Sequence, residues 1–118
     1  MRFSHLEKFF VWFLQRIFRE VTYPVYRGSV GLLEILGPNL PRPHSDSVKG
    51  SRFKNMKELR TQHAGRPYRT LYAFDPRRTA ILLIGGNKSG DDGWYQKYVP
   101  LADKLYEHHL KELEEEEG

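Results

Sequence analysis

The sequence predicts an α+β fold in which two N-terminal helices and a C-terminal helix pack on a small antiparallel sheet. Apolar residues recur at spacings of three and four near both ends of the chain, as in amphipathic helices, and alternate with other residues in the middle, as in strands. With 118 residues, 39% of them hydrophobic, the chain is expected to form one domain over residues 1–118. We expect a helical hairpin over 1–37, the sheet over 52–86 and the last helix over 98–114.

The first helix is expected over residues 5–20, where five large apolar residues share one face: Leu6, Phe10, Phe13, Leu14 and Ile17. The apolar run from Phe9 to Leu14 has six residues, whereas a membrane-spanning helix needs about 20. Charged neighbours and the lack of a small-residue cleavage site argue against a signal peptide. We therefore expect a core helix and no membrane partner, with an interfacial helix as the alternative.

The second helix is expected from Val25 to Leu36, after Tyr23-Pro24 interrupts the first. Gly37-Pro38 ends it, because Gly accepts the left-handed cap and Pro cannot continue a helix. Residues 38–51, rich in Pro and interleaved with Ser, are expected to form an extended connector.

The sheet is predicted by residues 68–74, in which two sets of side chains alternate. The next four residues, Asp75-Pro76-Arg77-Arg78, predict a tight turn because Pro supplies a fixed φ. Residues 80–84 are continuously apolar, which favours a central strand covered on both faces and an antiparallel hairpin with the preceding strand. Residues 57–60 add a short strand with weaker alternation.

The C-terminal part is expected to pass through a flexible polar loop over residues 85–93 into a helix that begins near Pro100. The loop lacks the pattern of a phosphate-binding loop, although Lys88 could reach from it into a cleft; the alternative is a mobile hairpin loop. His108 and His109 are expected on the exposed surface of the helix. With no cysteine and no metal-ligand spacing of histidines, no metal site is expected.

Charge is divided unevenly along the chain. Residues 1–90 contain 16 Lys and Arg against 6 Asp and Glu, and residues 91–118 contain 3 against 9. The densest basic segment is 42–78, with ten basic and three acidic residues and with Phe53, Tyr68 and Tyr72 between them. Cations neutralise phosphates and aromatic rings stack on unpaired bases, so this segment suits single-stranded RNA. The alternative is a solvated sheet face with its aromatic residues in the core.

Several short stretches between Leu36 and Leu110 are informative as an ordered set, because their order along the chain and the gaps between them matter more than any one of them. They are Leu36-Gly37-Pro38, Arg42-Pro43, residues 49–60, Gly65-Arg66, Tyr68-Arg69, residues 71–78, Lys88-Ser89-Gly90, Trp94-Tyr95, Pro100-Leu101-Ala102 and Tyr106. This ordered set, which covers about two-thirds of the chain, resembles the RelE/ParE superfamily of type II toxin–antitoxin toxins, closest to the HigB-like branch. The start departs from the family pattern, because Arg2-Phe3-Ser4 is at most a stub of the usual first strand.

The resemblance implies a RelE-like fold and a cytoplasmic bacterial endoribonuclease that cuts messenger RNA, commonly in the ribosomal A site. A cognate helix-turn-helix antitoxin would neutralise it. The implied chemistry uses no metal and no cofactor: the RNA 2′-hydroxyl attacks the adjacent phosphorus and leaves a cyclic phosphate. This reaction needs a base, an acid and cations on the transition state.

Carried over to this sequence, the resemblance implies that Arg60, Arg69 and Lys88 stabilise the phosphate. Glu58 and Tyr95 are the candidates for proton transfer. The structural alternative for Arg60 is a sheet-surface salt bridge to Glu58 or Asp75, and Glu58 could equally orient an arginine. General RNA contacts are expected from six further cations: Lys49, Lys54, Lys57, Arg66, Arg77 and Arg78.

Two other functions are open at this point. One is a ParE-like inhibitor that binds a gyrase-type protein partner and leaves RNA uncut. The other is an inactive, basic RNA-binding member of the fold. New RNA ends produced by the purified protein would exclude both.

Overall fold

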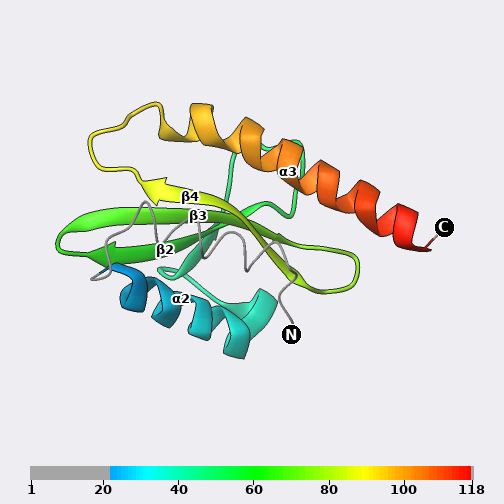
Figure 1. The fold of residues 1–118 in the computed structure, drawn as a ribbon. Helices are drawn as coiled ribbons and strands as arrows, with labels where there is room; N and C mark the ends of the chain where they lie inside the picture. The colour runs from blue at the N-terminus through cyan, green and yellow to red at the C-terminus, as the bar shows by residue number, and fades with distance from the viewer. Residues whose placement is uncertain (1–21, 118) are drawn as a thin grey trace.

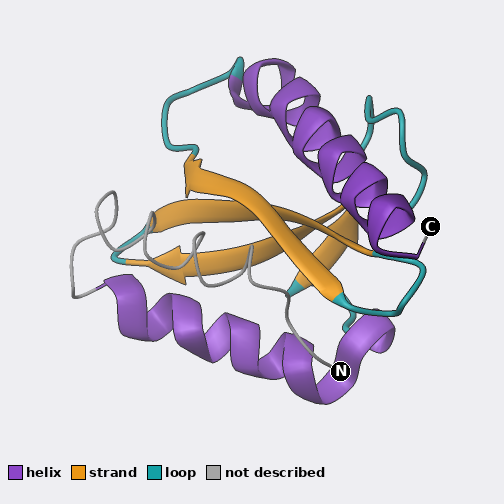
Figure 2. Cartoon of the chain, turned by 45° about the vertical axis from the view of Figure 1, so that its right-hand side comes forward, coloured by secondary structure: helices purple, strands orange, loops and turns teal. Residues whose placement is uncertain are grey.

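The computed structural model describes residues 22–117 and places a four-stranded antiparallel sheet between two helices (Figure 1). The elements are α2 (Thr22–Leu36), the 3-10 turn η1 (Gly37–Asn39), β1 (Ser45–Ser47), β2 (Lys57–His63), β3 (Arg66–Phe74), β4 (Ala80–Asn87) and α3 (Trp94–Glu117). α2 covers one face of the sheet and α3 covers the other (Figure 2). The α+β class is confirmed, whereas the helix expected over residues 5–20 lies outside the described residues.

α2 is the second of the two expected N-terminal helices. It begins at Thr22 rather than Val25, because Pro24 falls in the first turn, where no backbone N–H is needed for the helix. It ends where the sequence predicts, since Gly37 adopts a left-handed φ of 55°. Val30 is fully buried and fixes the helix against the sheet.

The strands follow the order β1-β2-β3-β4, and each neighbouring pair is antiparallel. The predicted hairpin is confirmed: β3 pairs with β4, and the Arg78 N–H donates to the Asp75 carbonyl oxygen at 2.9 Å in the turn. The sheet starts earlier than expected, because Ser45–Ser47 pairs with β2 inside the predicted connector. In the sheet that the described residues form, β4 is an end strand and not a central one, although both of its faces are covered.

Alternation along β3 sorts its side chains between two hydrophobic clusters, one under each helix. Tyr72 is fully buried on the α2 side, together with Leu33. Leu71 is fully buried on the α3 side, together with Trp94. Burial of each large apolar side chain contributes about 1.5–3 kcal/mol, so both helices are held firmly on the strands that carry the polar groups.

α3 begins at Trp94, six residues before the expected start at Pro100. Pro100 lies inside the helix, where it removes one backbone hydrogen bond. Trp94 and Val99 are 1% and 3% exposed, and their packing on the sheet outweighs that loss. The early start matters for the site, because it places the first turn of α3 beside the ends of β3 and β4.

His109 is buried, which corrects the expectation that both histidines of α3 lie on its surface. Its Nε2 lies 2.8 Å from Oδ2 of Asp75, while Oδ1 of Asp75 accepts the backbone N–H groups of Arg77 and Thr79 at 2.9 Å. His108 is exposed, as predicted. Asp75 therefore joins the β3–β4 turn to α3 and takes no part in pairing with Arg60.

Replacement of His109 by Ala is expected to lower the free energy of unfolding by about 2 kcal/mol, because it leaves the buried Asp75 carboxylate without one of its partners. Urea denaturation followed by circular dichroism measures the change. His108→Ala is the matched control, and as an exposed substitution it should stay within about 0.5 kcal/mol of the wild type. Equal effects of the two substitutions would contradict the anchoring role of His109.

Candidate functional site

The register of β2 and β3 places three charged side chains on the face that α3 covers. Arg60 lies directly opposite Arg69, and Glu58 lies opposite Leu71, whose side chain packs under α3. Because side chains two residues apart share a face, Glu58, Arg60 and Arg69 project to the same side. Opposed arginines repel one another, so the carboxylate between them is a structural requirement as well as a chemical group.

Glu58 is the centre of this arrangement and is 3% exposed. The Tyr95 hydroxyl donates to Oε1 at 2.6 Å, and Arg69 Nε lies 3.7 Å from the same oxygen. Arg60 donates from Nε to Oε2 at 3.0 Å, and its Nη2 forms an ion pair with the same oxygen at 2.9 Å. A buried carboxylate is tolerated only when donors and cations of this kind surround it.

Tyr95 and Lys88, which lie outside β2 and β3, are the remaining candidate residues near Glu58. Tyr95 comes from the first turn of α3, and Lys88 directly follows β4, where its N–H donates to the Pro67 carbonyl oxygen at 3.0 Å. Lys88 Nζ lies 5.7 Å from the centre of the Tyr95 ring. The structure thus brings together all five residues that the sequence suggested for catalysis.

Burial raises the pKa of the Tyr95 hydroxyl, and its hydrogen bond to Glu58 raises it further, against a lowering effect of Arg69. The phenol therefore keeps its proton at neutral pH and donates it to Glu58.

Sequence reasoning missed a second carboxylate, Asp46. It lies on β1 directly opposite Glu58, and its Oδ2 contacts Arg60 Nη2 at 3.1 Å and Arg42 Nε at 3.0 Å. The pKa of Asp46 is lowered, first by the hydrogen bond from the Ser47 N–H and then by Arg42 and Arg60, against partial desolvation. The Ser-Asp-Ser alternation of β1 was the available signal, but three residues are too few to indicate a strand. We call Asp46, Glu58, Arg60, Arg69, Lys88 and Tyr95 the Glu58 cluster.

The two arginines of the Glu58 cluster differ in their hydrogen-bond and ion-pair partners and in their exposure. Arg60 forms ion pairs with both Glu58 and Asp46, so the salt-bridge alternative is correct for its Glu58 partner. Arg69 donates from Nη1 to the Tyr68 carbonyl oxygen at 3.1 Å, and its buried Nε has no hydrogen-bond partner among the described residues. Arg69 is 11% exposed and its Nε faces Glu58, whereas Arg60 is 31% exposed and is held by two carboxylates.

The six cations expected to contact RNA do not gather on one surface. Arg66 lies at the end of the sheet where Lys88 emerges, since β3 begins there. Lys57 lies opposite Tyr72, on the α2 face of β2. The others lie in the β1–β2 loop or in the β3–β4 turn at the far end of the strands: Lys49, Lys54, Arg77 and Arg78.

The β1–β2 loop that carries Lys49 and Lys54 is held by α3. The buried Asp103 accepts the Ser51 hydroxyl through Oδ1 and the Arg52 N–H through Oδ2 at 3.0 Å. No group of three His, Cys, Asp or Glu side chains suited to a metal ion occurs within residues 22–117. Within the same part of the chain, no helix has the length and apolar character to span a membrane.

Comparison with known proteins matches residues 23–107 to the family described as "Phage derived protein Gp49-like (DUF891)". Two relatives are from Mycobacterium tuberculosis (strain ATCC 25618 / H37Rv). "Putative toxin HigB3" is 51% identical over 84 residues, which are 70% of this chain and 72% of that protein. "Putative toxin HigB2" is 43% identical over 114 residues, which are 95% of this chain and 56% of that protein. No solved structure is significantly similar to the chain.

The matched segment contains the whole sheet and the first half of α3, and therefore every member of the Glu58 cluster. It also spans well over half of the chain. The chain therefore belongs to the phage-derived Gp49-like family and is a relative of mycobacterial proteins named as HigB toxins.

Proposed function

We propose that the protein is the toxin of a toxin–antitoxin system and that it cleaves messenger RNA at the Glu58 cluster. The observation that carries the proposal is the position of the Arg69 guanidinium, which lines a cleft next to the Glu58–Tyr95 pair. A phosphate group is the charged acceptor that an arginine binds best, and the adjacent pair supplies a proton acceptor. The names of the two mycobacterial relatives support the toxin assignment.

In the proposed reaction the RNA 2′-oxygen bonds to the adjacent phosphorus and the bond from phosphorus to the 5′-oxygen breaks. Because Glu58 is buried, it acts through Tyr95: the tyrosine oxygen takes the 2′-hydroxyl proton while its own proton passes to Glu58 Oε1 over 2.6 Å. The ammonium group of Lys88 protonates the leaving 5′-oxygen. Arg69 holds the charged phosphate oxygens, and the products are a 2′,3′-cyclic phosphate and a 5′-hydroxyl.

Arg60 has a positioning role in this scheme. It fixes Glu58 Oε2 and is itself fixed by Asp46, so the carboxylate keeps Oε1 towards Tyr95. The pairing also prevents Arg60 from neutralising the incoming phosphate, a task that falls to Arg69 and Lys88.

The proposed partners are messenger RNA, bound on the ribosome, and a cognate helix-turn-helix antitoxin, with the cytoplasm as the site of action. A short helix-turn-helix protein encoded by the adjacent gene would support this assignment. Its co-expression should restore growth of cells that express the chain.

Expression of the chain alone is expected to arrest bacterial growth, and the purified protein is expected to produce new RNA ends. Incubation with message, with and without ribosomes, followed by primer extension maps the cuts, and end-labelling identifies 5′-hydroxyl and cyclic-phosphate termini. Growth arrest without new RNA ends would overturn the nuclease proposal and favour inhibition of a gyrase-type protein. RNA binding without cleavage or arrest would favour an inactive RNA-binding protein.

A further inference from the structure

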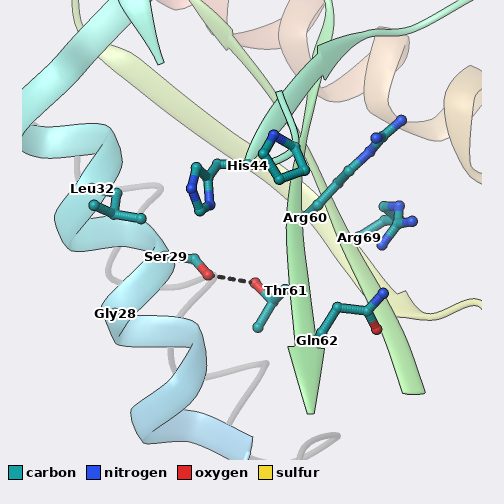
Figure 3. A pocket seen from close by; sticks show the side chains of 9 residues that line it. Gly28, Ser29, Leu32, His44, Arg60, Thr61, Gln62 and Arg69 are labelled. Carbon is teal, nitrogen blue, oxygen red and sulfur yellow. Dashed lines mark hydrogen bonds between the residues drawn. The ribbon is translucent and has the colours of Figure 1, made fainter. Parts of the chain in front are cut away.

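A cleft of about 580 Å³ lies between α2 and the open edge of β2 (Figure 3). Gly28 and Leu32 of α2 form one wall, and His44 and the neighbouring backbone of β2 form the other. Gln62 lines the outer edge of β2 and points away from α2 (Figure 3). Figure 3 shows His44 and Leu32 facing each other in the space between helix and strand. The floor is fixed, because Thr61 Oγ1 donates to Ser29 Oγ at 2.8 Å.

The cleft exists because β1 ends early. β1 pairs only with residues 57–59 of β2, and the Arg60 N–H donates to the His44 carbonyl oxygen at 2.8 Å as the last contact on that side. Beyond it, residues 61–63 of β2 have no strand neighbour on their outer edge within residues 22–117. The absence of a side chain at Gly28 widens the opening, since a Cβ there would meet nothing within 4 Å.

Two polar side chains in the cleft are uncommitted. Neither the His44 ring nor the Gln62 amide makes a side-chain hydrogen bond or ion pair with another described residue. At the end of the cleft nearest β3, Arg60 and Arg69 form part of its lining and extend away from α2 (Figure 3). The cleft therefore continues directly into the Glu58 cluster.

This combination suits a nucleotide. Leu32 and the His44 ring offer surfaces for the faces of a flat base, and the Gln62 amide, at the outer edge of β2, offers both a donor and an acceptor for a base edge that reaches past this strand. The volume lies within the range of small-molecule sites. Arg69 lines the same cleft and supplies the counter-charge for the attached phosphate.

We propose that this cleft binds the nucleobase of the RNA nucleotide whose phosphate Arg69 holds. The inference rests on the proposed function and adds a base-binding subsite to it. Gln62 and His44 then select the base next to the cleaved bond, while the Glu58 cluster acts on the phosphate whatever the base is. Stacking is tolerant of sequence, so discrimination among bases falls to the Gln62 amide.

Calorimetric titration of the wild-type protein with nucleoside 5′-monophosphates and with ribose 5-phosphate tests the subsite without requiring cleavage. The base is expected to strengthen binding by about tenfold over ribose 5-phosphate. Gln62→Ala and Gly28→Leu should both remove this advantage and leave the affinity for ribose 5-phosphate unchanged. Leu is favoured over Gly in a helix, and its side chain would occupy the cleft.

Gly31→Leu is the matched control. Gly31 lies in the same helix, a Cβ there also meets nothing within 4 Å, and the residue does not line the cleft. This variant should keep the full advantage of the base. Equal affinities of the wild type for nucleotide and ribose 5-phosphate, or equal losses in the two leucine variants, would overturn the subsite.

Failure of the subsite and failure of the nuclease proposal give different results. A base-dependent affinity that Gly28→Leu removes, in a protein that makes no RNA ends, would retain the subsite and reject cleavage. Cleavage of a short RNA that is unaffected by an abasic nucleotide at each position around the cut would retain the nuclease and reject the subsite. Abasic substitution at one position should instead slow cleavage by about tenfold.

Discussion

Arg69→Ala is expected to slow RNA cleavage by about 10²–10³-fold and to relieve growth arrest, because it removes the donor that stabilises the charged transition state. In the proposed site the Arg69 guanidinium holds the phosphate beside the Glu58–Tyr95 pair, so its loss leaves the phosphate without its principal partner. Single-turnover rates on a synthetic RNA measure the effect. Arg69→Lys should recover part of the rate, since an ammonium keeps the charge but not the paired donors.

Lys104→Ala serves as the control for Arg69→Ala. It removes one positive charge from an exposed position on α3 and should leave the rate unchanged. Full toxicity of Arg69→Ala, with a circular dichroism spectrum like that of the wild type, would contradict the assignment of the phosphate site.

Tyr95→Phe and Glu58→Gln are each expected to slow cleavage by about 10²–10⁴-fold, because either change breaks the path from the 2′-hydroxyl to the buried carboxylate. The double variant should cleave no more slowly than the slower of the two single variants, since residues that act as one unit give strongly non-additive losses. Single-turnover rates of the three variants complete the cycle.

Tyr98→Phe, one turn along α3, is the control, since Tyr98 packs on Trp94 and makes no contact with Glu58. It should cleave at the wild-type rate. If the losses of Tyr95→Phe and Glu58→Gln multiply, the two residues act independently and the relay is wrong.

Much of the fold follows from local pattern. The alternation of residues 68–74 predicts β3 and assigns its side chains to two faces, and the clusters under α2 and α3 confirm the assignment. The same alternation places Arg69 on the α3 face of the sheet. The resemblance had named Arg69 as a site residue without assigning it to a face. Gly37 and Asp75 also act as the sequence predicts, because capping and turn chemistry depend on few neighbours.

The sequence-based predictions were wrong or incomplete where contacts with residues distant in the sequence determine the structure. Asp46 became a member of the site only through a three-residue strand that β2 stabilises. Pro100 suggested a helix start, but packing of Trp94 on the sheet overrides that preference. His109 had a usable signal, since Ala102, Tyr106, His109 and Leu113 recur at spacings of four, three and four on the buried side of α3.

The opposed arginines of β2 and β3 have a consequence for the folding equilibrium. Two like charges held face to face oppose folding, and the carboxylates of Glu58 and Asp46 offset this repulsion. Any polyanion that binds the native chain shifts this balance by thermodynamic linkage. A polyanion that binds the Glu58 cluster is therefore expected to raise the free energy of unfolding, so the resistance of the chain to proteolysis should increase with the concentration of such a ligand.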